Sequence, residues 1–347
     1  MVSPVPDATS LQALLGQAIN LHQQGQLAEA DALYAQVLAH QPGNAMAWQL
    51  RGVALAQAGQ PAQALPLVDQ ALALRPDVAE IHNNRGMVLQ QLRRFKDAAT
   101  SHARAAALKP GLVDALNNQG VALAELGLHA QALAAYDAVL AQQPGFANAW
   151  SNRGTALRAL GRHTEAARSY TQALALHPGF PYAAGHALYA QSYVCDWTGH
   201  ADKVAQLQQA VAQGGAGALA AEPFTLMAFS GDPQTLLDNA RAYTASKYPP
   251  HAQPLWTGER YRHDRIRVAY LSADFHDHAT AYLMAECFER HDSTRFDTIA
   301  ISIGPDRQDG MRQRLQKAFG RFIDVREQSD AEVAQLLRSL EVDIAVD

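Results

Sequence analysis

A repeat of fixed length runs through the first half of the chain and limits the folds that this half can adopt. Prolines recur every 34 residues, and alanines, glycines and leucines keep the same step at other positions. The recurring residues are Pro42, Pro76, Pro110, Pro144 and Pro178; Ala30, Ala64, Ala98, Ala132 and Ala166; Gly52, Gly86, Gly120 and Gly154; and Leu55, Leu89, Leu123 and Leu157. Agreement between independent residue types predicts one structural unit that is used five times, starting near residues 10, 44, 78, 112 and 146.

A period of 34 residues with small residues at two fixed positions is typical of the tetratricopeptide repeat, a pair of antiparallel helices that stacks into a solenoid. Glycine in the first helix and alanine in the second let the helix axes approach closely, and proline ends the second helix. Gly25, Gly59, Gly127 and Gly161 lie between the two helices, where a helix end favours a left-handed residue. Arg93 interrupts this series, so we expect the third unit to turn in another way.

Asparagines form a further series, at Asn84, Asn118 and Asn152, two residues before the glycine of three first helices. First helices line the concave face of such a solenoid, so these amides would form a ladder along a groove. A carboxamide both donates and accepts hydrogen bonds and can hold the backbone of an extended peptide. The alternative is a polar residue on a solvated face. Leu50 takes this position in the second unit, so the ladder is short at its N-terminal end.

The position immediately before the glycine also departs from the common pattern. Many repeats of this kind have leucine there, whereas this chain has Arg51, Arg85, Gln119 and Arg153. A long polar side chain at this position can face the groove or pair with an acid on a neighbouring helix. The sequence leaves both roles open.

From Arg265 onward, segments with the pattern of strands alternate with segments that have the pattern of helices. We expect strands at 266–272, 296–303, 321–325 and 342–347, and helices at 280–289, 310–319 and 329–340. In the helix at 280–289 we expect Leu283, Met284, Cys287 and Phe288 to face inward; the helix at 329–340 has a capping box at Ser329 and Glu332. Such alternation predicts a doubly wound parallel α/β sheet.

The chain is therefore expected to have three parts. Residues 1–179 form five tetratricopeptide repeats, 180–264 a partial sixth repeat and a helical or irregular connector, and 265–347 the beginning of an α/β lobe. The last strand ends at Asp347 with nothing after it to cover it, and a parallel sheet needs helices on both faces. We therefore expect this sequence to be a fragment of a longer lobe.

Composition excludes several classes of protein. A net charge of −5 gives no basic field for nucleic acid, and no apolar run is long enough to cross a membrane. The first ten residues lack the basic and apolar regions of a signal peptide. Cys195 and Cys287 fit no disulfide or zinc spacing and are expected to be buried thiols. A cytoplasmic location follows from these expectations.

His276, Asp277 and His278 follow the first strand of the α/β part, at the sheet edge where chemistry takes place in such folds. In one interpretation an imidazole is a general base, and the positive end of the next helix keeps His278 neutral. In a second, the two histidines bind a metal, although no third ligand is evident. In a third, these are polar loop residues, with Asp277 as the helix N-cap. The residues leave the three open.

The sequences "VCDWT" at 194–198 and "RVAYLSADFHDH" at 267–278, joined to the repeats, closely resemble the O-linked N-acetylglucosamine transferases, especially shorter bacterial members. The resemblance covers nearly the whole chain. On this match His278 falls on the family's active-site histidine, which is proposed to take a proton from the acceptor hydroxyl. A phosphate oxygen of the donor is the other proposed base. The family usually has proline after this histidine, whereas this chain has Ala279.

The resemblance implies an inverting transfer of N-acetylglucosamine from UDP-N-acetylglucosamine to serine or threonine of a polypeptide, with no metal or other cofactor. It implies two facing Rossmann-like lobes and a solenoid groove in which Asn84, Asn118 and Asn152 hold the acceptor backbone. The donor-binding residues are expected beyond Asp347, so this chain alone is expected to be inactive. A related branch of the family glycosylates asparagine, which leaves the acceptor residue open.

Two other functions stay open at this stage. The first is a peptide-binding scaffold in which the α/β part has no chemistry. The second is a metal-dependent hydrolase that uses His276 and His278.

Overall fold

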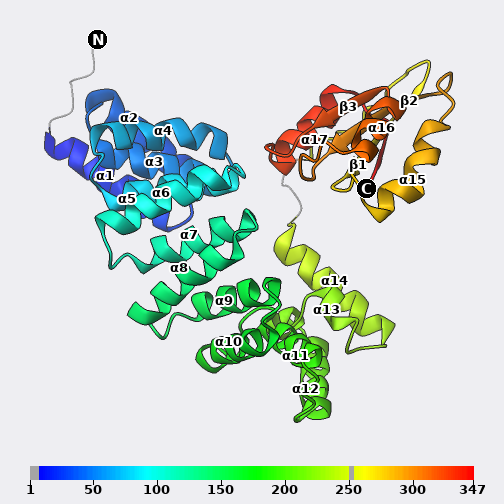
Figure 1. Cartoon of the computed structure of the whole chain (residues 1–347). Helices are drawn as coiled ribbons and strands as arrows, with labels where there is room; N and C mark the ends of the chain where they lie inside the picture. Colours follow the sequence, from blue (N-terminus) through cyan, green and yellow to red (C-terminus); the bar gives the residue numbers. More distant parts are fainter. Residues whose placement is uncertain (1–7, 250–253) are drawn as a thin grey trace. The chain divides into compact units, whose positions relative to one another are not determined.

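The computed structural model describes residues 8–249 and 254–347 and divides into two compact units, residues 1–250 and 251–347 (Figure 1). The first unit is helical, and the second contains a parallel β-sheet with helices. This agrees with the fold class predicted from the sequence, an α-solenoid followed by an α/β region. In the described part of the chain no helix combines the length and the apolar character that a membrane crossing demands.

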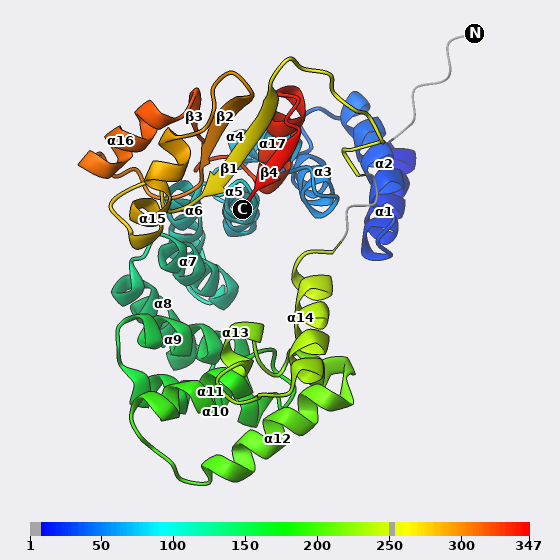
Figure 2. The ribbon, with the colours of Figure 1, turned by 90° about the vertical axis from the view of Figure 1, so that its right-hand side faces the viewer.

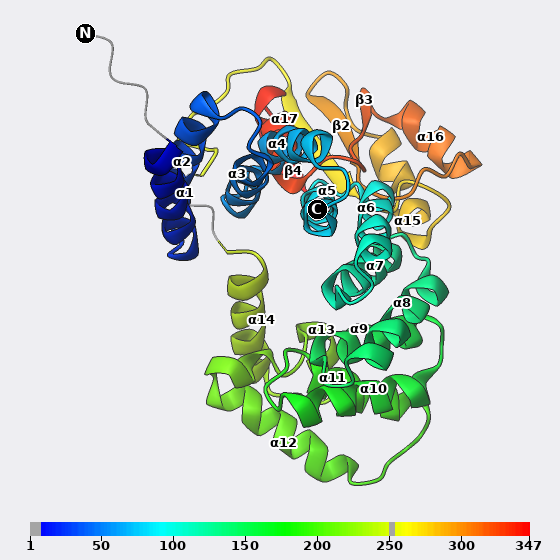
Figure 3. The same cartoon turned by 90° about the vertical axis from the view of Figure 1, so that its left-hand side faces the viewer.

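The five repeats are five antiparallel helix pairs that follow one another along an arc (Figure 3). The pairs are α1 (Ala8–Gln23) with α2 (Leu27–His40), α3 (Ala45–Gln57) with α4 (Pro61–Leu74), α5 (Ala79–Gln91) with α6 (Phe95–Leu108), α7 (Val113–Glu125) with α8 (His129–Gln142), and α9 (Ala147–Ala159) with α10 (His163–Leu176). The second helix of each pair ends two residues before one of the periodic prolines. The period in the sequence is therefore the period of the helix pairs.

Each periodic glycine of a first helix lies against one side chain of the second helix. A Cβ added at Gly86, Gly120 or Gly154 would come within 2.5–2.7 Å of a ring atom of His102, Tyr136 or Tyr170, respectively. The matching alanines of the second helices are fully buried. Small residues therefore allow a ring to fill the crossing in the third, fourth and fifth repeats, where the ring of the third is a histidine, whereas in the second repeat Gly52 lies against Val68.

The prediction that the third repeat turns differently is wrong. Arg93 adopts a left-handed conformation with φ of 57°, close to the 73° of Gly127 in the next repeat. Its backbone N–H bonds the carbonyl of Gln90 at 2.9 Å, just as that of Gly127 bonds Ala124 at 2.9 Å. Because the neighbouring repeats fix the turn, the arginine accepts a conformation that costs a side-chain-bearing residue about 1–2 kcal/mol.

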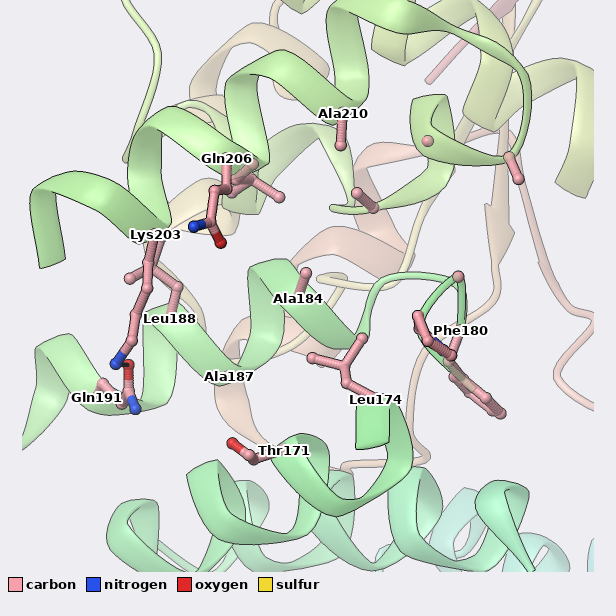
Figure 4. A pocket seen from close by; sticks show the side chains of 16 residues that line it. Thr171, Leu174, Phe180, Ala184, Ala187, Leu188, Gln191, Lys203, Gln206 and Ala210 are labelled. Carbon is pink, nitrogen blue, oxygen red and sulfur yellow. Dashed lines mark hydrogen bonds between the residues drawn. The ribbon is translucent and has the colours of Figure 1, made fainter. Parts of the chain in front are cut away.

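The remainder of the first unit comprises α11 (Ala183–Tyr193), α12 (His200–Gln213), η1 (Gly215–Leu219), α13 (Pro223–Leu226) and α14 (Pro233–Lys247). Here the repeat pattern breaks down, because Gly185 of α11 lies against Ala221 rather than against a residue of α12. Between α10, α11 and α12 lies a largely apolar cavity of about 490 Å³ (Figure 4). Lys203 and Gln191, which line it, are hydrogen-bonded at 3.0 Å.

In the second unit, strands β1 (Ile266–Ser272), β2 (Phe296–Ser302), β3 (Arg321–Asp324) and β4 (Ile344–Val346) pair in parallel in the order β3-β2-β1-β4. Helices α15 (Ala279–Glu289) and α16 (Gly310–Ala318) pack on one face of the sheet, and α17 (Asp330–Ser339) packs on the other (Figure 2). The predicted capping box at Ser329 and Glu332 is present. All four strands end at one edge, next to the loops that precede the helices.

Two expectations about side-chain burial are wrong. In α15, Phe288 is buried and Met284 is partly buried as expected, but Leu283 is 81% exposed and the other core-facing residues are Ala281 and Ala285. The helix begins one residue earlier than predicted, and its buried face is centred on the two alanines. Cys287 on this helix and Cys195 are exposed free thiols.

Candidate functional site

His278 lies at the carboxyl edge of the sheet, between β1 and α15. It is the N-cap residue of α15, with extended backbone, and its side chain is 45% exposed. The imidazole is therefore open to solvent at the place where parallel α/β sheets bind substrates. This exposed position is open to a reacting group, and the hydrogen bond at the start of α15 gives the same residue a capping role.

Two groups compete for the Nδ1 atom of His278. The backbone N–H of Thr280 lies 3.3 Å away, and an Oδ atom of Asp274 lies 3.4 Å away. When Nδ1 accepts from Thr280, a neutral ring carries its proton on Nε2 and cannot act as a base through that atom. When Nδ1 donates to Asp274, Nε2 has a free lone pair and can take a proton, as in other acid–histidine pairs.

Asp274 was not identified from the sequence, although it lies in the same stretch, four residues before His278. Its carboxylate is about one-third exposed, and its backbone N–H donates to Ser272 Oγ at 3.0 Å. The loop after β1 therefore holds an acid next to the imidazole. Asp274 could have been predicted from the sequence, because it follows the same predicted strand as His278.

His276 and Asp277 do not share the environment of His278. His276 is only 7% exposed, and its Nδ1 is buried with no hydrogen-bond partner in the described residues. Asp277 is not the N-cap as predicted, because His278 has that position. The backbone N–H of Asp277 instead donates to Asp309 at 3.0 Å, and the Asp277 carboxylate raises the pKa of Tyr282 by accepting its hydroxyl proton in a hydrogen bond.

A buried arginine supports this edge of the sheet. Arg312 of α16 is 3% exposed and donates to Ser302 Oγ at 3.1 Å and to Asp324 at 3.0 Å, at the ends of β2 and β3. The N-cap of the same helix is Asp309, whose pKa is lowered by the backbone N–H groups of Asp277 and Arg312. One ionic network thus connects the loop that bears His278 to two strand ends. Sequence analysis missed Arg312, because an arginine on an amphipathic helix is usually exposed.

The geometry gives little support to a metal site in this loop. The rings of His276 and His278 are perpendicular, with centroids 5.8 Å apart, and one is buried while the other is exposed. Across residues 8–249 and 254–347, no group of three histidine, cysteine or acidic side chains is arranged to hold a metal ion.

The second candidate site is the asparagine series of the repeats. Asn84, Asn118 and Asn152 are half-buried on the first helices. The amide of Asn118 donates to Asn83 at 3.4 Å, and that of Asn152 donates to Asn117 at 3.1 Å, each on the preceding repeat. These bonds use one N–H of each amide, so the second N–H and the carbonyl oxygen remain for a ligand.

The arginines before the glycines form ion pairs rather than contacts in the groove. Arg85 binds Asp69 at 2.6 Å and Ser101 Oγ at 2.8 Å, and Arg153 binds Asp137 at 2.6 Å. Arg51 likewise pairs with an acid of the preceding helix. Each guanidinium therefore connects one repeat to the previous one. In the fourth repeat both members of the ion pair are replaced together: Gln119 stands in place of the arginine, and Ala103 stands in place of the acid that is Asp69 or Asp137 in the neighbouring repeats.

Comparisons with known families agree with both units. The model described as "Glycosyl transferase family 41" matches residues 248–346, and the model described as "Tetratricopeptide repeat" matches residues 15–65, 50–113 and 117–184. The chain is also similar to the "Probable UDP-N-acetylglucosamine--peptide N-acetylglucosaminyltransferase SEC" of Arabidopsis thaliana, with 26% identity over 135 residues. That match covers 36% of this chain and 14% of the relative. The resemblance found in the sequence is confirmed, and the chain spans about one-seventh of that relative.

Solved structures show the solenoid fold alone. The type IV pilus biogenesis factor PilW is 21% identical with a TM-score of 0.54, over 61% of this chain and 97% of that one. PilF of Pseudomonas aeruginosa is 18% identical with a TM-score of 0.51, over 60% of this chain and 94% of that one. These similarities support the solenoid architecture of the first unit and carry no information on the function of the chain.

Proposed function

We propose that the chain belongs to a protein glycosyltransferase that moves N-acetylglucosamine from UDP-N-acetylglucosamine to a serine or threonine hydroxyl. The observation that carries the proposal is the exposed imidazole of His278 next to Asp274, within the segment that matches glycosyl transferase family 41. The relative in Arabidopsis thaliana, whose name describes a UDP-N-acetylglucosamine–peptide transferase, supports the choice of donor.

In this reaction Nε2 of His278 takes the proton of the acceptor hydroxyl while the oxygen bonds to the anomeric carbon. The bond from that carbon to the diphosphate breaks, and UDP leaves, so the configuration at the carbon inverts. Asp274 holds the proton on Nδ1 and keeps Nε2 free. A phosphate oxygen of the donor is the alternative base, and asparagine is the alternative acceptor.

The repeats would bind the acceptor polypeptide through Asn84, Asn118 and Asn152. No described residue is assigned to the donor, and the proposal requires no metal. We place the protein in the cytoplasm, since the exposed thiols of Cys195 and Cys287 suit a reducing compartment.

The test separates the imidazole from the helix cap that the same residue provides. His278→Asn removes the base, whereas asparagine is itself a good N-cap, so α15 keeps its start. In the longest natural polypeptide that contains this chain, we expect transfer to fall by about a hundredfold or more, the usual contribution of a general base. UDP binding, measured by calorimetry, should be unchanged. Full transfer by the variant would contradict the role of His278.

A non-catalytic peptide-binding scaffold is the second candidate. The half-buried amides of the solenoid favour it, because they need no chemistry to hold a peptide. If the natural polypeptide binds extended peptides but neither binds UDP nor consumes UDP-N-acetylglucosamine, the scaffold replaces the transferase.

A further inference from the structure

A cavity of about 660 Å³ with several charged and polar side chains in its lining lies within the first unit, where the fifth repeat meets α11. One face of α9 forms a wall of this cavity through Ala147, Asn148, Ser151, Asn152, Thr155 and Arg158. Residues from α11, the segment before it, the start of α13 and the end of α14 form the other walls. Because Asn152 is the last member of the asparagine series, the cavity is continuous with the face on which that series lies.

The charged groups of the cavity are two cations and one acid. Arg158 and Lys247 are the cations, and Glu222 is the acid. Glu222 is already engaged, since His186 lies 3.2 Å from its carboxylate and both groups are partly buried. The other titratable side chains that line the cavity are His177, His186 and Tyr182.

Neither cation forms an ion pair with a carboxylate in the described residues, although, after the larger effect of the His186 hydrogen bond, both positive charges are near enough to help lower the pKa of Glu222. The Nε atom of Arg158 is buried with no hydrogen-bond partner in the described residues, and another part of its guanidinium hydrogen-bonds the hydroxyl of Tyr170, a neutral acceptor. Lys247 donates to the hydroxyl of Tyr243 at 2.9 Å, a neutral acceptor. By contrast Arg153, on the same helix, is paired with Asp137 at 2.6 Å. A half-buried guanidinium with spare donors is a strong site for a carboxylate or phosphate.

The sequence of α9 departs from the repeat at the positions that line the cavity. The equivalents of Arg158 in the second, third and fourth repeats are uncharged, namely Ala56, Gln90 and Ala124, and the first repeat has His22 there. The equivalents of Asn148 in the third and fourth repeats are Glu80 and Asp114. The fifth repeat has therefore lost a carboxylate and gained a cation on the same face. Solenoid packing does not need this change, because the other repeats stack without it.

Tyr182, which also lines the cavity, has a left-handed backbone conformation that is uncommon for a residue other than glycine. Tyr182 has φ of 64°, and its backbone N–H donates to the carbonyl of Leu219 at 2.7 Å. For a bulky residue this conformation costs free energy and persists only where its surroundings impose it, which is common at ligand sites.

We propose that this cavity binds an anionic group of an extended polypeptide whose backbone lies along the asparagine series. The anion, a carboxylate or a phosphate, lies between Arg158 and Lys247 and fixes the register of the polypeptide on the solenoid. This proposal concerns binding alone and does not depend on sugar transfer.

The test uses the whole chain and fluorescein-labelled peptides of alternating serine and alanine with an amidated C-terminus. One peptide is uncharged, a second ends in two glutamates, a third ends in two phosphoserines, and a fourth is the uncharged peptide with a free C-terminal carboxylate. Fluorescence anisotropy gives the Kd of each without any sugar donor. We expect at least one anionic peptide to bind about tenfold more tightly than the uncharged one, equivalent to about 1.4 kcal/mol. The peptide that gains most identifies the source of the anion.

Charge variants assign the effect to the cavity. Arg158→Gln and Lys247→Gln should each remove most of the tenfold advantage and leave the Kd of the uncharged peptide unchanged. Arg168→Gln is the matched control, because Arg168 is an exposed arginine of α10 that does not line the cavity. Equal binding of charged and uncharged peptides, no binding at all, or an equal effect of Arg168→Gln would overturn the proposal. Circular dichroism of each variant excludes a loss of fold as the cause.

Discussion

The solenoid and the α/β unit differ in how their residues reveal a role. In the solenoid each position occurs five times, so a residue that departs from the series is visible at once, as with Arg93, His102 and Arg158. In the α/β unit each position occurs once, and Asp274 and Arg312 gain meaning only from their neighbours in space. Exceptional residues can therefore be recognised from the sequence in the repeats, whereas in the α/β unit the contacts of the candidate site can be recognised only from the structure.

The largest expected effect comes from the unit without repeats. Asp274→Asn keeps the size of the side chain but no longer favours the proton on Nδ1 of His278. If the transferase proposal holds, steady-state transfer by the natural polypeptide should fall by about a hundredfold, because the ring then favours the tautomer that caps α15. Asp277→Asn is the control, since that carboxylate faces Tyr282 and should change the rate little. Equal losses in both variants would point to damage to the loop as a whole.

The next effect tests an exception inside the solenoid. His102 is fully buried, its Nδ1 lies 2.8 Å from the side-chain oxygen of Asn83, and burial lowers its pKa from 6.5 to about 4. The unfolded chain therefore binds this proton at a higher pH than the folded chain. Stability is lost as the pH falls from 6.5 toward 4, by about 3 kcal/mol when the loss is complete.

His102→Tyr introduces the residue that the fourth and fifth repeats have at this crossing. We expect the variant to lack that part of the acid sensitivity, so its melting temperature should fall less than that of the wild type between about pH 7.5 and about pH 4.5. Differential scanning calorimetry at the two pH values measures this difference. Parallel declines in the two proteins would show that His102 does not titrate in the way described.

The smallest effect concerns the turn of the third repeat. Arg93→Gly removes the steric strain of a side chain in the left-handed conformation, but it also raises the entropy of the unfolded chain. The net effect should be a stabilisation of the first unit by about 0.5–1 kcal/mol. Gly127→Arg in the next repeat should destabilise it by a similar amount. Urea unfolding followed by circular dichroism measures both. A stabilising Gly127→Arg would mean that the turn does not constrain the side chain as its φ implies.

The solenoid was largely predictable from the sequence, because a helix pair needs the same small residues and the same prolines every time it is used. The error at Arg93 arose because stacking of the neighbouring repeats overrides the preference of one residue. The strands of the α/β unit were also predictable, to within one or two residues. The burial of α15 was not, since Leu283 and Ala285 are both apolar and only the sheet decides which of them faces inward.

The candidate sites divide in the same way. The position of His278 followed from its place after a strand, whereas its contact with Asp274 depends on the shape of the loop. The ion pairs of Arg85 and Arg153 depend on which side of a helix meets the previous repeat. Lys247 and Arg158 are far apart in the sequence, and only the fold brings them to one cavity.

The most direct measurement is the identity of the product. The natural polypeptide is incubated with UDP-N-acetylglucosamine labelled in the sugar and with an unstructured serine- and threonine-rich polypeptide, and the products are analysed by mass spectrometry and NMR. The account predicts the label on a serine or threonine oxygen, with the anomeric configuration inverted. Release of all the label as free sugar, or no use of the donor, would contradict it.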